Sequence, residues 1–164
     1  MRIAKQIITL IFLGTVIYSC KPKPNEQIVS FENTETYTII ADTIITDVVI
    51  KNPTDDEWVN YTLRHLDKKT LVDQIFNAVY TKQIIPYDFF NETELTIEQV
   101  KAIETDPDFS RDKIGKVQFE EKWYYDSKTN TMIKKVHSIM LAFELYNAEG
   151  EIKGYKPAFK VYLK

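Results

Sequence analysis

The chain has 164 residues, of which 44% are hydrophobic and 27% charged, and its 21 basic and 24 acidic side chains leave a net charge of −3. This length and composition suffice for one domain with a hydrophobic core, and two domains are not expected. With only four glycines, one cysteine and two histidines, the sequence excludes glycine-rich phosphate-binding loops, a disulfide framework and a structural zinc site.

The first 19 residues have the layout of a signal peptide. Arg2 and Lys5 precede an uncharged apolar run, Ile7–Tyr18, which is shorter than the roughly 20 residues needed to span a bilayer. A buried N-terminal helix is the alternative interpretation of this run, but the charged residues on both sides favour export.

Cys20 directly follows this leader. The stretch from Ile17 to Cys20 resembles a bacterial lipobox, which implies lipid attachment to the Cys20 thiol and an outer-membrane lipoprotein that faces the periplasm. Loss of the leader changes the net charge to −5, and an acidic chain is a poor partner for nucleic acid. We expect a lipoprotein signal peptide over 1–19, a solvated tether over 20–27 and a single α+β domain over 28–164.

The first half of that domain shows strand signals followed by helix signals. Residues 36–50 are rich in Thr, Ile and Val, which predicts one or two strands broken near Ala41-Asp42. Three threonines are each followed three residues later by an acid or amide, a spacing typical of helix capping boxes. They are Thr54, Thr70 and Thr96, and the helices expected after them cover 55–66, 71–79 and 97–103.

Beyond Lys113 the apolar residues recur at every second position. This period predicts three strands, over 117–125, 132–146 and 155–163, joined by turns at 126–130 and 147–150. The predicted fold is therefore α+β, with two or three helices followed by a three-stranded antiparallel C-terminal meander. We expect the last strand to be an open edge that accepts a partner strand or, alternatively, one whose outward Lys156, Lys160 and Lys164 keep it from aggregating.

Chemistry-bearing motifs are scarce. No nucleophile elbow, metalloprotease motif or C-x-x-C occurs, and no metal, cofactor or catalytic residue is expected. A three-residue loop over 128–130, with Asn130 in the left-handed conformation, would place Val117 opposite Leu141 and Phe119 opposite Ile139. The same register places Glu121 opposite His137, as a stabilising cross-strand pair or, alternatively, an acid–base pair. Trp123, Tyr124 and Tyr155 are candidate interaction residues, because aromatic side chains dominate interface hot spots.

Several segments occur in the order found in one family. They are LVDQIFNAV, IIPYD and LTIEQV within residues 71–100, EKWYYD over 121–126 and YKPAFKVY over 155–162. This order resembles GldN and PorN, periplasmic components of the type IX secretion and gliding machinery, over about residues 67–164. The family's basic, tryptophan-containing strand and long C-terminal extension are not evident, and its known members partner a separate lipoprotein. The chain therefore resembles a short, anchored relative.

The resemblance implies a non-enzymatic ring or scaffold subunit, with envelope proteins as partners and no catalytic residues. Two functions remain open. A lipid-anchored structural or interaction subunit of an outer-membrane-associated envelope complex predicts an exposed aromatic sheet face and no deep polar pocket. A small-ligand-binding periplasmic lipoprotein or hydrolase predicts a pocket of several hundred Å³ around Glu121 and His137.

Overall fold

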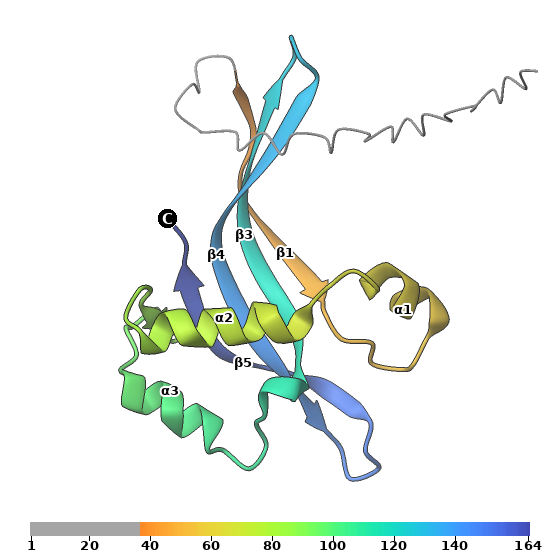
Figure 1. The fold of residues 1–164 in the computed structure, drawn as a ribbon, viewed down its shortest axis with the longest axis vertical. Helices are drawn as coiled ribbons and strands as arrows, with labels where there is room; N and C mark the ends of the chain where they lie inside the picture. Colours follow the sequence, from red (N-terminus) through yellow and green to blue (C-terminus); the bar gives the residue numbers. More distant parts are fainter. Residues whose placement is uncertain (1–36) are drawn as a thin grey trace, which may run out of the picture. The chain divides into compact units, whose positions relative to one another are not determined.

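The computed structural model describes residues 37–164. Its five strands form one antiparallel sheet in the order β1-β3-β4-β5-β2. The strands are β1 (Thr38–Val49), β2 (Pro86–Tyr87), β3 (Ile114–Asp126), β4 (Thr131–Tyr146) and β5 (Ile152–Tyr162). The helices are α1 (Glu57–Leu63), α2 (Lys68–Tyr80) and α3 (Ile97–Glu104), and a 3-10 turn, η2, covers Arg111–Lys113. In Figure 1, α2 crosses one face of the sheet.

The predicted fold class is wrong, because the structure is mostly an antiparallel sheet of five strands with three short helices. β1 precedes all three helices in sequence yet pairs with β3 over most of its length, from Thr38 opposite Tyr125 to Val49 opposite Lys116. β2 pairs with the end of β5. Local periodicity predicts individual strands, but it carries no information on pairing between strands that are distant in sequence.

The N-terminal caps of the three helices test the three predicted capping boxes. The box predicted at Thr96 is confirmed, since its hydroxyl accepts from the amide of the N3 glutamine at 3.2 Å while that side chain accepts from the Thr96 amide at 2.7 Å. The boxes predicted at Thr54 and Thr70 are wrong. Asp56 and Asp67 cap α1 and α2 instead, because their carboxylates accept from the amide three residues on.

The core lies between α2, α3 and one face of β3, β4 and β5. At its centre Phe76 is fully buried and packs edge-on against Phe159, with ring centroids 5.0 Å apart. The other members of this buried apolar cluster are Ile50, Val72, Ile75, Val79, Val100, Phe109, Ile114, Val117, Ile139, Leu141, Phe143, Ala158 and Val161, and Met140 and Ala142 of β4 are buried as well. Both helices that bury residues pack on this side, so we call the opposite side of the sheet, which carries Gln118, Glu120 and Lys122, the helix-free face.

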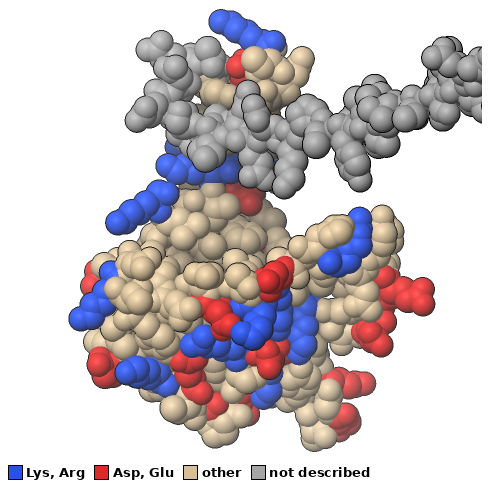
Figure 2. All heavy atoms as spheres, in the orientation of Figure 1, with Lys and Arg blue, Asp and Glu red and all other residues tan. Residues whose placement is uncertain are grey.

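Arg111 fastens α2, α3 and the start of β3 together. Its guanidinium donates to Asp73 at 2.9 Å and to Glu104 at 2.6 Å, and it lies 4.2 Å from the centroid of the Phe76 ring. Figure 2 shows basic and acidic side chains interspersed over this side of the molecule. Ion pairs and a ring contact thus join α2, α3 and the segment that leads into β3.

α1 is held by hydrogen bonds rather than by burial, since none of its residues is buried. The Asn52 side chain donates to the Asp56 carbonyl at 2.7 Å and to the Asn60 side chain at 2.9 Å. On the exposed surface of the helix, Trp58 stacks on Tyr61 with centroids 5.5 Å apart. The helix therefore presents an aromatic pair to solvent, with Trp58 69% exposed.

Candidate functional site

Two strand irregularities open a hollow on the sheet. In β1 the register shifts between Ala41 and Ile44, where Thr43 adopts a φ of 60°. In β4, His137 is an extra residue, because its two neighbours pair with consecutive residues of β3. Such bulges bend strands and re-aim side chains, and they are frequent beside functional sites. The hollow has a volume of about 250 Å³ and is lined by Asp42, Thr43, Glu120, Glu121, Lys122, Tyr124, Lys135 and His137.

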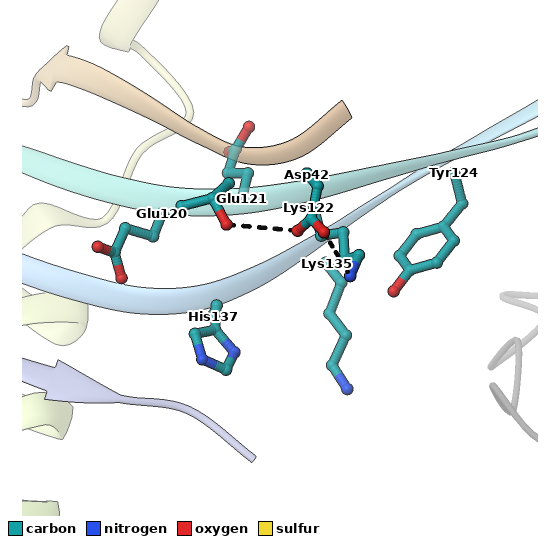
Figure 3. Close-up of a pocket in the computed structure, with 8 residues that line it drawn as sticks. Asp42, Glu120, Glu121, Lys122, Tyr124, Lys135 and His137 are labelled. Carbon is teal, nitrogen blue, oxygen red and sulfur yellow. Dashed lines mark hydrogen bonds and ion pairs between the residues drawn. The ribbon is translucent and has the colours of Figure 1, made fainter. Parts of the chain in front are cut away.

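Alternate positions of β3 supply one wall of the hollow. Glu120, Lys122 and Tyr124 point to the same side of the strand in Figure 3, whereas Glu121 points to the other side. Lys122 reaches across to β1, where its ammonium lies 3.1 Å from the Asp42 carboxylate. The β1 irregularity therefore brings an acid within reach of a β3 lysine.

Lys160 from β5 lies beside the hollow and is almost completely buried, with a side chain 6% exposed. Its ammonium donates to Glu120 at 3.0 Å and to Glu92 at 3.3 Å. The Ser138 hydroxyl donates to the other oxygen of Glu120 at 2.6 Å. Glu120 therefore joins the wall of the hollow to a polar cluster that reaches the loop after β2.

The charges in this cluster reinforce each other. Burial by itself lowers the pKa of Lys160, but hydrogen bonds with Tyr162, Glu120 and Glu92 outweigh it and hold that pKa above its usual value. Burial likewise raises the pKa of Glu120, yet bonds from Ser138 and Lys160 outweigh it and hold that pKa below its usual range. Both groups stay ionised near neutral pH, which suits orientation of a polar group better than proton transfer.

The predicted pairing of Glu121 with His137 is wrong, because Glu121 stands opposite Val136. The Glu121 carboxylate accepts from the Trp123 ring nitrogen at 2.8 Å and lies 3.8 Å from the Lys134 ammonium. The His137 ring instead packs edge-on against the last tyrosine of β5, with centroids 5.8 Å apart. Both residues belong to the lining of the hollow, but their side chains point to opposite sides of the sheet.

The turn explains this change of register. The loop has four residues, 127–130, rather than three, although Asn130 adopts the predicted left-handed conformation with φ 53°. The longer loop shifts the pairing by one residue, and the extra residue at His137 shifts it back. The register predicted at Val117 and Phe119 is therefore confirmed, whereas the register from Glu121 to the turn is not.

The three candidate interaction residues do not form one surface. Trp123 and Tyr124 are neighbours in β3 and so lie on opposite sides of the sheet, with Lys134 4.1 Å from the Trp123 ring centroid. Tyr155 lies in β5 opposite Glu144, and Lys116 is 4.9 Å from its ring centroid. Of the three, Tyr124 alone lines the hollow.

Of the three lysines predicted to point outward from the last strand, Lys160 is buried, whereas Lys156 and Lys164 are exposed. β5 is not a free edge throughout, because β2 pairs with it at Lys160 and Val161. Lys160 points into the polar cluster rather than outward, and Lys156 lies 3.5 Å from Asp106. Glu92 lies 68 residues earlier in the chain, so no local pattern links it to Lys160.

Cys20 lies outside the described residues, so its predicted lipidation stays a prediction. Within residues 37–164, no helix has the length and apolar character needed to cross a membrane. The same described range contains no group of three or more His, Cys, Asp or Glu side chains arranged to hold a metal ion.

These features define a small protein built on an antiparallel sheet, with helices on one face. The other face has a polar hollow whose charged side chains form ion pairs within the chain. Residues 41–164 match the family model described as gliding motility associated protein GldN. The chain belongs to the GldN family, which confirms the resemblance and makes it a component of the gliding motility and secretion machinery. No curated protein matches the chain.

Proposed function

We propose that the protein is a non-enzymatic, lipid-anchored periplasmic subunit that works by surface contact within an outer-membrane-associated complex of gliding and type IX secretion. The family match over residues 41–164 carries this proposal. The lipobox-like stretch ending at Cys20 supports the anchor. Each buried CH₂ of an acyl chain contributes about 0.8 kcal/mol, so two or more chains hold a protein on a membrane without a spanning helix.

The exposed aromatic residues of α1 support a role in surface contact. Trp58 and Tyr61 are stacked, and the Arg64 guanidinium lies 3.8 Å from the centroid of the Tyr61 ring. Trp, Tyr and Arg are the residue types most enriched at interface hot spots. Because the helix buries none of its residues in this chain, these side chains are available to a partner.

Membrane fractionation tests the anchor. After a carbonate wash, the wild-type chain and the control Ser19→Ala, which keeps a small residue before the cysteine, should remain in the outer-membrane fraction. Cys20→Ala should be released, because it has no thiol to acylate. Retention of Cys20→Ala wholly with outer membranes would contradict the lipid-anchored part of the proposal.

A second function, the binding of a small polar ligand, is favoured by one observation. Glu121 and His137 both line a hollow, as that hypothesis requires, and its volume is about 250 Å³. Ligand pockets usually measure about 300–1,000 Å³, and the acids here already have partners within the chain. A thermal-shift screen with dicarboxylates, amino acids and disaccharides tests it. A compound that raises the melting temperature of the wild type but not of His137→Ala would favour this function.

A further inference from the structure

β1 is an open edge of the sheet. Within the described part of the chain, it pairs with β3 on one side and with no strand on the other. After the register shift at Ile44, six consecutive residues, Ile44–Val49, continue in regular register. This length matches the mean strand of about 5–6 residues, so the run offers a complete template for another strand.

The hydrogen bonds between β1 and β3 show which way the backbone groups of this run point. The Ile50 amide donates to the Gly115 carbonyl at 2.8 Å, so Ile50 faces β3. Because the N–H and C=O groups of successive residues point to opposite sides of a strand, those of Ile45, Asp47 and Val49 point away from β3. Their side chains share the helix-free face, since Asp47 stands opposite Gln118.

The other end of the sheet is protected, in contrast to β1. β2 covers the end of β5, and the segment 93–95 in turn covers β2, where the Leu95 amide donates to the Pro86 carbonyl at 2.8 Å. The rest of β5 contains Pro157 and a register shift, both of which discourage strand pairing. The run Ile44–Val49 contains neither proline nor a register shift.

The exposed side chains of this run have a simple pattern. Ile45 is 60% exposed and Val49 is 38% exposed, and Asp47 lies between them on the same face. The Asp47 carboxylate already accepts from Lys116 at 2.9 Å and from Gln118 at 2.8 Å. A carboxylate has about four acceptor sites, so it has capacity for a further cation.

We propose that Ile44–Val49 accepts an extended segment of another envelope protein as a sixth strand, with aliphatic, basic and aliphatic side chains at alternate positions opposite Ile45, Asp47 and Val49. This inference rests on the proposed function, because it names the kind of partner that the surface contact would engage. A second copy of β1 fits less well. The antiparallel register that sets Ile45 against Val49 also sets one Asp47 against the other, and like charges in facing positions are destabilising.

Two synthetic peptides test the proposal on the full chain in detergent. One carries valine, lysine and valine at alternate positions with threonines between them, and the other replaces its lysine by glutamate. The lysine peptide should bind about fivefold more tightly, and Asp47→Lys should reverse this preference. In hydrogen-exchange NMR, the bound lysine peptide should protect the amides of Ile45, Asp47 and Val49 of the wild-type chain. The amides of Thr46 and Val48 are already bonded to β3.

Two variants of one residue separate backbone pairing from side-chain contact. Val49→Pro removes an outward N–H without breaking a bond to β3, and it should weaken binding of the lysine peptide about tenfold. Val49→Thr keeps the N–H and the β-branched shape, and it should bind like the wild type. Equal affinity for the two peptides, or no new protection at the three outward amides, overturns the proposal. Protection that rises with protein concentration in the absence of peptide also overturns it, in favour of a second copy.

Cross-linking in cells separates this proposal from the proposed function. If the wild type and Val49→Pro capture the same envelope proteins, the contact lies elsewhere, so the strand proposal fails while the proposed function stands. If the wild type captures no envelope protein and is also released from membranes, the proposed function fails whatever the peptides show. Loss of a cross-linked protein in Val49→Pro but not in Val49→Thr supports both.

Discussion

Replacing Lys160 by methionine removes a buried ammonium group while keeping most of the side-chain volume. The ammonium lies 3.0 Å from Glu120 and 3.3 Å from Glu92, but the Glu92 side chain is 62% exposed and contributes little. The loss should therefore come mainly from Glu120, whose side chain is 21% exposed and keeps Ser138 as its remaining hydrogen-bond donor.

The magnitude follows from these distances. At an effective dielectric constant of about 20, two unit charges 3.0 Å apart attract by about 5 kcal/mol, and desolvation offsets much of this. Removing one partner of a fully buried pair costs about 3–5 kcal/mol, and the partial exposure of Glu120 lowers this range. We expect Lys160→Met to reduce the free energy of unfolding by about 2–3 kcal/mol, and Glu120→Gln by about 1 kcal/mol.

Urea unfolding followed by circular dichroism measures these changes and those of the double variant. The double variant should lose about 1–2 kcal/mol less than the sum of the single variants, because each single change leaves a partner unsatisfied. Lys153→Met, an exposed lysine in the same strand, is the matched control and should stay within about 0.5 kcal/mol of the wild type. Additive losses, or a Lys160→Met protein as stable as the control, would refute the assignment of a coupled pair.

The same cycle predicts a pH dependence. The folded-state pKa of Glu120 is lowered, so its contribution is present above the usual value of about 4.3 and is lost as pH falls through the folded-state value. The pKa of Lys160 is raised, so its contribution is complete below the usual value of about 10.4 and is lost as pH rises through the folded-state value. The coupling energy should therefore be constant from about pH 6 to 9 and should decline below about pH 4.

Three further substitutions test other parts of the structure. Arg111→Lys should lower the free energy of unfolding by about 1–2 kcal/mol in urea titrations, since lysine lacks the planar fork that joins the carboxylates of α2 and α3. Gly115→Ala should cost about 1–3 kcal/mol and lower the melting temperature, because a Cβ there would lie 2.7 Å from the Glu144 carboxylate. Trp58→Ala should change the free energy of unfolding by less than about 0.5 kcal/mol, since the exposed ring belongs to a helix with no buried residue. A larger loss in calorimetry would mean that α1 packs against the rest of the protein.

Local signals predicted the elements well where the cause is local. The break expected near Ala41-Asp42 is present as a register shift in β1, and the capping box at Thr96 forms as its spacing indicates. The left-handed Asn130 in the hairpin was predicted for the same reason. In each case a few consecutive residues determine the conformation.

The arrangement of the sheet and the polar hollow depend on distant residues. Alternation in the last strand correctly assigned Phe159 and Lys160 to opposite faces, but it did not reveal that the lysine meets Glu120 and Glu92. The four-residue loop places Val136 opposite Glu121, and the extra residue at His137, which has no sequence signature, restores the predicted register from Glu120 onward, away from the turn. The site could not be assembled from local periodicity, because it depends on loop length and on pairing across the whole chain.

The placement of β1 has a consequence for the newly made chain. Translation produces this strand before the helices, yet its partner is β3, so the strand has nothing to pair with until residues 114–126 emerge. A segment rich in Ile, Val and Thr is prone to intermolecular β-aggregation during that delay. Asp42 and Asp47 interrupt its aliphatic run and act as gatekeeper charges in the unfolded chain. The two carboxylates that later pair with Lys122 and Lys116 thus protect the strand from aggregation before those lysines exist.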